Sequence, residues 1–216
     1  MNRFFEKALP IWPTGREKEM NLTVGFRTIL SGQHDTEAVL RIAASTIYRV
    51  SVNGHFIGHG PARGPHGFYR VDEWALNRFL TEERNIIAIE VNGANVNSYY
   101  TLDQPSFVQA EVRSGDNILA SSHDSEGDFE AIVLRQRVQK VQRYSYQRTF
   151  VEYYRMNSKR MTGSSTPMKA CRLKLVKSLN RKCSLAEAFL TQSSVFCPRN
   201  VFYSLENLCH LSRIPS

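Results

Sequence analysis

Two short stretches carry most of the side chains that could recognise a ligand. They read GPARGPHGFYRVDEW, from residue 60 to 74, and NVNSYYTLDQ, from residue 95 to 104. A sugar offers apolar C–H faces and a rim of hydroxyl groups, so its binding sites combine aromatic rings with planar polar groups. Both stretches have this composition. The candidate carbohydrate-binding residues are Arg63, His66, Tyr69, Arg70 and Asp72 in the first stretch, and Asn97, Tyr99, Tyr100, Asp103 and Gln104 in the second.

The same side chains also allow a purely structural interpretation. Arg70 could form an ion pair with Asp72 or with Glu73, which would take its charge out of ligand binding. The other structural roles are burial in the core, for Tyr69 and Trp74, and capping of turns, for Asn95 and Asn97. The composition of the stretches leaves both interpretations open.

No recognisable catalytic arrangement accompanies these stretches. Inverting hydrolysis of a glycosidic bond needs two carboxyl groups about 6.5–9.5 Å apart. The carboxylates that could in principle form such a pair are Asp72, Glu73, Glu90 and Asp103. The histidines outside the two stretches and the C-terminal region are scattered in predicted loops or near turns: His34, His55, His59 and His123. We therefore expect no metal site, no cofactor and no identifiable catalytic residue.

β-Strands have to position the two stretches. In YRVSVNGHFIGHG, alternating apolar residues lead to Asn53-Gly54, and both turn residues tolerate the positive φ of a type I′ hairpin. A short return strand over 56–58 follows, before glycines and prolines break the ladder. Strands are predicted at 21–29, 38–44, 48–52, 68–71, 85–92, 106–112, 117–121 and 129–133. This spacing predicts a mainly β fold, an antiparallel jelly roll or β-sandwich of the galactose-binding-like type, with an irregular C-terminal tail.

Three segments depart from this strand pattern. Residues 74–80 have the apolar spacing of one short amphipathic turn of helix. Residues 135–154 are polar and aromatic, and their periodicity does not decide between helix and strand. A capping box of Ser184 with Glu187 predicts a helix over 184–190.

The C-terminal region differs from the rest in charge and in cysteine content. Residues 1–154 hold 17 Lys and Arg against 18 Asp and Glu, whereas residues 155–216 hold 11 against 2, so the net charge of +8 comes from this tail. Its basic residues are scattered without a nucleic-acid-binding motif, and we expect no nucleic-acid partner. All four cysteines also lie there, without C-x-x-C spacing: Cys171, Cys183, Cys197 and Cys209. We expect the four cysteines to be free thiols, and the alternative that they form disulfides is kept.

Two further exclusions concern membranes and export. No apolar run approaches the roughly 18 residues of a membrane span, so we expect no membrane partner. The N-terminus lacks the apolar stretch and cleavage site of an export signal. We therefore expect a cytoplasmic location, with an extracellular one left open.

Between residues 10 and 154 the sequence resembles the N-terminal region of bacterial α-L-rhamnosidases of glycoside hydrolase family 78. Four stretches carry the resemblance in one order: PIWPTGREKEMNLTVGFR, ASTIYRVSVNGHFIGHGPARGPHGFYRVDEW, NIIAIEVNGANVNSYYTLDQPSFVQAEV and RVQKVQRYSYQRTFVEYYR. The resemblance implies a non-catalytic jelly-roll module in front of an (α/α) barrel that holds the catalytic carboxylates. That barrel is missing from this sequence, and no catalytic residue is carried over.

The resemblance also suggests how the chain is divided. We expect an N-terminal segment over 1–19, a β-sandwich domain over 20–134, a connecting segment over 135–155 towards a missing next domain, and a basic tail over 156–216. The family pattern ends at about Tyr154. Our hypothesis is that the tail is an out-of-frame or degraded translation after a truncated module, and that it is disordered.

The resulting functional expectation is an accessory module, inactive by itself, of an α-L-rhamnosidase-type glycoside hydrolase. Its partner would be a rhamnose-containing carbohydrate or the missing catalytic domain, against which the two stretches could pack. The alternative is a free-standing carbohydrate-binding protein. A complete glycosidase that uses a pair of loop carboxylates ranks last.

Overall fold

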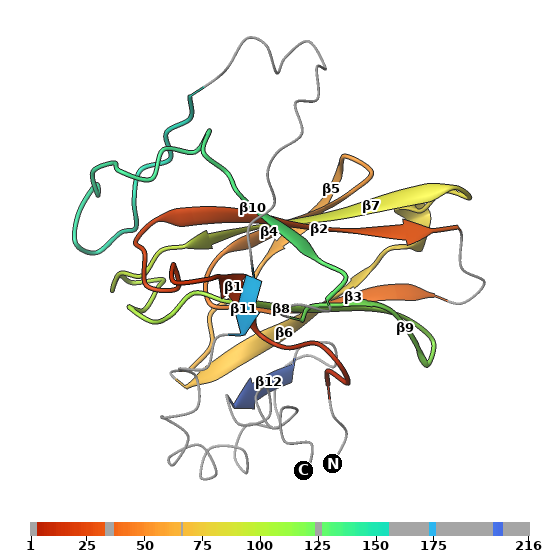
Figure 1. Ribbon diagram of the computed structural model, residues 1–216. Coiled ribbons are helices and arrows are strands. Elements are labelled where there is room, and N and C mark those ends of the chain that lie inside the picture. Colours follow the sequence, from red (N-terminus) through yellow and green to blue (C-terminus); the bar gives the residue numbers. More distant parts are fainter. Residues whose placement is uncertain are drawn as a thin grey trace.

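The structure, a computed structural model, describes residues 4–32, 37–65, 67–123 and 127–155, together with two short strands further along the chain. Two antiparallel sheets lie face to face and form a β-sandwich (Figure 1). This confirms the predicted mainly β fold. Within the described part of the chain, no helix has the length and apolar composition that crossing a membrane requires.

One layer is a five-stranded sheet with the order β10-β2-β7-β4-β5. Its strands are β2 (Leu22–Ser31), β4 (Tyr48–Val52), β5 (His55–Gly60), β7 (Arg84–Gly93) and β10 (Glu130–Val133). On β7, Ile87, Ile89 and Val91 are buried and Glu90 lies between them. Because side chains alternate along a strand, Glu90 points to the outer face of the sheet.

The second layer has the order β11-β1-β8-β3-β6-β12, with β9 paired to β8. Its strands are β1 (Ile11–Pro13), β3 (Ala38–Ala44), β6 (Phe68–Ala75), β8 (Val108–Ser114), β9 (Asn117–Ser121), β11 (Leu173–Leu175) and β12 (Val201–Ser204). β1 lies within the expected N-terminal segment and pairs with β8 opposite Val108.

Apolar side chains from both layers fill the space between the sheets. Trp12 of β1 and Phe26 of β2 come from different sheets, and their rings lie 5.7 Å apart. Tyr69 and Phe107 meet edge to face at 4.7 Å. Burial of one such side chain contributes roughly 1.5–3 kcal/mol, so the core accounts for the stability of the sandwich.

The hairpin prediction at Asn53-Gly54 is confirmed. Their φ angles are 51° and 81°, as a type I′ turn requires. The return strand was predicted too short: β5 continues to Gly60, which pairs with Tyr48 in the register of β4.

The predicted turn of helix over 74–80 is wrong in its first part. Trp74 belongs to β6, where it pairs with Leu40, and only a single 3-10 turn, η1, covers Asn77–Phe79. Trp74 and Leu76 also fit the alternation of a strand, and the pairing of β6 with β3 decides in favour of the strand.

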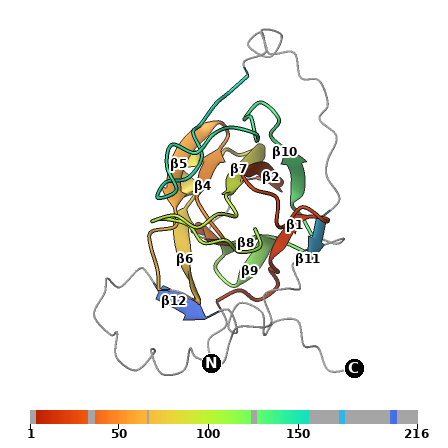
Figure 2. The same cartoon turned by 90° about the vertical axis from the view of Figure 1, so that its left-hand side faces the viewer.

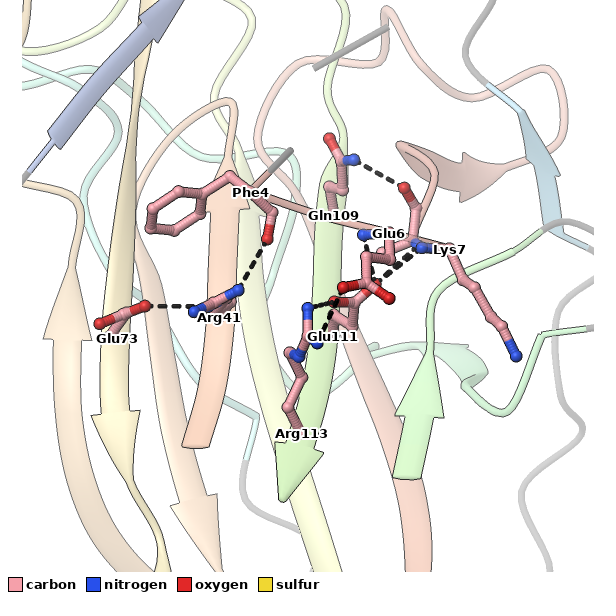
Figure 3. Close-up of polar contacts among 9 residues, drawn as sticks. Phe4, Glu6, Lys7, Arg41, Glu73, Gln109, Glu111 and Arg113 are labelled. Carbon is pink, nitrogen blue, oxygen red and sulfur yellow. Dashed lines mark hydrogen bonds and ion pairs between the residues drawn. The ribbon is translucent and has the colours of Figure 1, made fainter. Parts of the chain in front are cut away.

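The N-terminal strap, residues 4–9, lies across the outer face of the second sheet (Figure 3). Glu111 of β8 is fully buried, and its Oε2 accepts the backbone N–H groups of Glu6, Lys7 and Ala8 at 3.0, 2.8 and 3.2 Å. Gln109 Nε2 donates to the Ala8 carbonyl at 2.7 Å. The strap therefore covers a polar row of β8 and supplies hydrogen-bond partners to Glu111 Oε2 and Gln109 Nε2.

The 136–155 hairpin lies against the outer face of the five-stranded sheet. It is irregular rather than a helix or a strand pair, with isolated bridges of Arg137 to Tyr154 and of Arg143 to Phe150. Arg137 Nη1 lies 3.9 Å from Glu90 Oε1, and Asn21 Nδ2 donates to the Gln139 carbonyl at 2.8 Å. The hairpin rises above β10 and β2 in Figure 1.

Of the tail, the structure describes only β11 and β12, which pair with β1 and β6. The predicted helix at 184–190 and the four cysteines lie outside the described residues. The out-of-frame origin of the tail stays a prediction.

Candidate functional site

Both candidate stretches lie at the same end of the sandwich, which we call the loop end. Residues 61–67 connect β5 to β6, and residues 94–107 connect β7 to β8. The register of β4 explains their proximity, because Tyr48 is paired with Gly60 on one side and with Val91 on the other. Figure 2 looks onto this end.

Two side-chain contacts join the stretches. The Tyr69 hydroxyl donates to Gln104 Oε1 at 2.7 Å. The Arg63 guanidinium carbon lies 4.4 Å from the centroid of the Tyr100 ring, which is a cation–π contact. Arg63 and Tyr100 are exposed, whereas Tyr69 is buried. The structure therefore unites the two stretches in one surface, with Tyr69 and Gln104 as its support.

Arg70 and Asp72 form a network at the base of this surface. Asp72 is buried; its Oδ1 accepts from Arg70 Nε at 2.6 Å and its Oδ2 accepts from the Tyr48 hydroxyl at 2.5 Å. Trp74 Nε1 donates to Tyr48 Oη at 3.1 Å. Burial and the Asp72 carboxylate raise the pKa of Tyr48 well above its usual range. The ion pair between Arg70 and Asp72 matches the structural interpretation of these two residues.

Gly60 permits the close approach of this network. A Cβ atom at Gly60 would lie 2.5 Å from Asp72 Oδ2 and 2.6 Å from Tyr48 Oη, which is closer than real Cβ atoms come. Any other residue there would push the network apart. The end of β5, from which the first stretch begins, is thus packed directly on the Asp72 and Tyr48 side chains at the base of the surface.

The second stretch closes on itself through polar groups. Asn97 Oδ1 accepts the Asp103 backbone N–H at 2.9 Å, and Ser98 Oγ accepts the Tyr100 backbone N–H at 3.0 Å. Asn97 therefore caps a turn, as the structural interpretation proposes. Asn97 is nevertheless exposed to solvent. Tyr99 and Tyr100 are left 65% and 58% exposed.

The 136–155 hairpin adds two tyrosines that the sequence stretches did not include. The Tyr99 backbone N–H donates to the Gln147 carbonyl at 2.9 Å, and Arg143 Nη2 donates to the Asn97 carbonyl at 2.8 Å. These bonds fix the hairpin tip to the second stretch. At the tip, Tyr144 and Tyr146 are 77% and 78% exposed. We call the exposed set the aromatic platform: Tyr99, Tyr100, Tyr144 and Tyr146.

The carboxylates named as a conceivable hydrolytic pair do not share an open site. Glu73 lies on the outer face of the second sheet and accepts from Arg41 at 2.8 Å (Figure 3). Glu90 lies on the opposite outer face of the sandwich, and Asp72 is buried in its network. Asp103 is the exposed member at the loop end.

His66 lies outside the described residues. Within the described ranges, no group of three or more His, Cys, Asp and Glu side chains could hold a metal ion.

Two rhamnosidases are among the solved structures that share this fold. The family 78 rhamnosidase of Bacillus sp. GL1 superposes with a TM-score of 0.67 and 22% identity, over 79% of this chain and 18% of that one. The α-L-rhamnosidase of Aspergillus terreus superposes with a TM-score of 0.55 and 16% identity, over 79% and 21%. No family model and no curated protein matches the chain.

These two likenesses establish the fold of the chain. The chain spans about a fifth of the length of the two rhamnosidase structures. One of them is bacterial and the other fungal, so the likeness is not specific to bacterial proteins. A shared fold does not carry a shared function, which has to be argued from the site.

Proposed function

We propose that the chain is a non-catalytic β-sandwich module of an α-L-rhamnosidase-type glycoside hydrolase. It acts by contacting carbohydrate through its loop end, or by packing this end on the catalytic domain. The observation that carries the proposal is the match of most of this chain to a small part of two rhamnosidases. Because the match covers about a fifth of each rhamnosidase, we infer that the chemistry lies outside the matched region.

The loop end supports carbohydrate contact by its chemistry. Arg63 and Tyr100 form an exposed aromatic–cationic pair, and Tyr99 stands beside them with an open ring. Asn97 and Asp103 add exposed polar groups that can bond to hydroxyls. Rings that bind C–H faces, next to planar donors and acceptors, suit a sugar.

Titration calorimetry of the whole chain with L-rhamnose and with a rhamnose-containing oligosaccharide tests the proposal. We expect saturable heat that is lost in the double variant Arg63→Ala, Tyr99→Ala. Arg84→Ala, at the far end of β7, is the matched control and should bind like the unchanged chain. Absence of heat from the folded protein would contradict carbohydrate contact and leave the packing role.

Turnover of an aryl rhamnoside tests the non-catalytic part. We expect none, because Glu73 and Glu90 lie on opposite faces and Asp72 is buried. Turnover that Asp103→Asn abolishes would contradict this part of the proposal, since Asp103 is the exposed carboxylate at the loop end.

A further inference from the structure

The two arginines beside the aromatic platform, like Arg78 over Phe79, contact rings rather than carboxylates. Seven arginines of the described chain form ion pairs with carboxylates: Arg16, Arg27, Arg41, Arg49, Arg70, Arg113 and Arg137. Arg63 and Arg148 instead lie over tyrosine rings, 4.4 Å from the centroid of Tyr100 and 5.4 Å from that of Tyr144. Both arginine residues are exposed.

This placement keeps both guanidinium groups available to a ligand. A tyrosine ring attracts a cation but does not neutralise it, so Arg63 and Arg148 keep their full charge. The ring contact also restricts the side chain, so that less conformational entropy is lost when its N–H groups bind. The ligand groups that match a guanidinium are carboxylates and phosphates, which can accept two parallel hydrogen bonds.

The charge around the hairpin favours an anionic ligand as well. Between residues 135 and 155, Glu152 is the single acidic residue. The basic residues of this segment are Arg135, Arg137, Lys140, Arg143, Arg148 and Arg155. Arg137 is committed to Glu90 and Glu152, and Arg143 to backbone carbonyls of the loop end. The hairpin therefore carries a net positive charge, and Asp103 is the exposed carboxylate of the second stretch beside it.

We propose, resting on the carbohydrate contact proposed above, that the aromatic platform binds an acidic oligosaccharide, a sugar chain that bears uronic acid carboxylates. Arg63 and Arg148 bind the carboxylates, and Tyr99, Tyr144 and Tyr146 contact the faces of the sugar rings. Four exposed tyrosines on two separate segments exceed what one monosaccharide can cover. The ligand is therefore a chain of several units rather than a single sugar.

Exposed tyrosines between arginines are also found in proteins that bind single-stranded nucleic acids. The sandwich fold shared with two rhamnosidases favours the saccharide. An oligonucleotide therefore belongs in the test as a competitor.

Calorimetric titration of the whole chain compares an oligogalacturonate with its fully methyl-esterified counterpart, which differs only in its masked carboxylates. We expect the acidic form to bind roughly tenfold tighter, and this preference to weaken as salt is added. The double variant Arg63→Gln, Arg148→Gln should remove the preference. Arg84→Gln, which deletes the same charge at the far end of β7, should leave it unchanged.

The possible outcomes separate this inference from the proposed function. If the two forms bind with equal affinity, or if the double arginine variant keeps the preference, the proposal of an acidic ligand is wrong. The proposed carbohydrate contact would not be affected by either result. Tighter binding of an oligonucleotide than of the oligogalacturonate would also overturn the proposal of an acidic oligosaccharide. If neither uronate form nor the rhamnose-containing oligosaccharide binds, the proposed carbohydrate contact is wrong as well.

Discussion

Two segments cover the outer faces of the sandwich, and the hairpin depends more on exposed side chains than the strap does. The hairpin also has a buried anchor, since Asn21, which is 2% exposed, donates to the Gln139 carbonyl. Buried side chains hold the N-terminal strap, since Glu111 and Gln109 are both 0% exposed and bond directly to its backbone (Figure 3). Surface ion pairs help to hold the 136–155 hairpin, such as Arg49 to Glu152 at 3.7 Å, with side chains 50% and 47% exposed.

We assign the strap to the stability of the fold and the hairpin to recognition. Removal of the strap would leave buried polar groups of β8 without partners. The resulting loss in the free energy of unfolding is large compared with the total stability of a small domain. The hairpin meets the sheet through Asn21 and Arg137 at its base, and it holds Tyr144 and Tyr146 in water at its tip. Ordering large rings without burying them brings the fold no gain, so binding is the better account of their position.

The largest expected effect breaks the strap. Glu111→Leu removes the acceptor of three backbone N–H groups, and we expect the free energy of unfolding to fall by about 3 kcal/mol. Urea unfolding of the whole chain measures it. Glu6→Gln is the control, because Glu6 is half exposed and pairs only at the rim with Arg113, so the change should stay within about 0.5 kcal/mol. A loss below 1 kcal/mol in Glu111→Leu would show that the strap is dispensable.

The next effect concerns binding rather than stability. Tyr144→Ser with Tyr146→Ser should weaken oligosaccharide binding roughly tenfold or more, which is about 1.4 kcal/mol or more. The unfolding midpoint should stay unchanged, because both side chains are more than three-quarters exposed. Calorimetry and urea unfolding on the same samples separate the two effects. A large loss of stability with unchanged affinity would reverse the roles assigned to the two segments.

A smaller effect loosens the hairpin. Arg137 lies between Glu90 and Glu152, and Arg137→Met keeps the aliphatic stem but removes both ion pairs. We expect a loss of about 1 kcal/mol in local stability. Hydrogen exchange should quicken at the Val138 and Arg155 amides, which bond across the hairpin, and stay unchanged at Lys7. Equal quickening at Lys7 would mean that the two segments are coupled.

The smallest effect is a pH dependence at the base of the hairpin. Glu19 accepts from Arg16 at 2.7 Å and from Gln139 at 3.1 Å, and the bond from Arg16 is the main reason that its pKa is lowered from 4.5. Because the pKa of Glu19 is lower in the folded protein than in the unfolded chain, its ionised form stabilises the fold at pH values above the unfolded pKa. This stabilisation is lost as the pH falls from the unfolded pKa through the folded pKa. Because Glu19 is more than one-third exposed, solvent screens the pair, and the loss should amount to a few tenths of a kcal/mol. Acid titration of hairpin amide exchange should show it, and Glu19→Gln should flatten the curve.

Local patterns account for what could be predicted of the fold. Asn53-Gly54 needs only its own backbone preferences to form the turn, and the alternation in 85–92 needs only one covered face to become β7. Trp74 shows the limit of such patterns, because its spacing fits both a helical turn and a strand. Pairing with Leu40, far away in the sequence, settles it.

Long-range contacts account for what could not be predicted. Glu111 meets Glu6 across 105 positions, and nothing near either residue announces the bond. The union of the two candidate stretches depends on the register of β4, and the addition of Tyr144 and Tyr146 depends on a bond between Tyr99 and Gln147. The available signal was the aromatic content of 144–146 alone, because this segment folds into turns whose geometry the spacing does not predict.

The most direct test of the account is an NMR titration of the isotope-labelled whole chain with the rhamnose-containing oligosaccharide and with the oligogalacturonate. We predict saturable shifts at Arg63, at 97–104 and at 144–148, while the amides of the N-terminal strap stay in place. Shifts spread over the strap and the outer sheet faces, or no saturable shift with either saccharide, would contradict the claim that the loop end is a carbohydrate-binding surface.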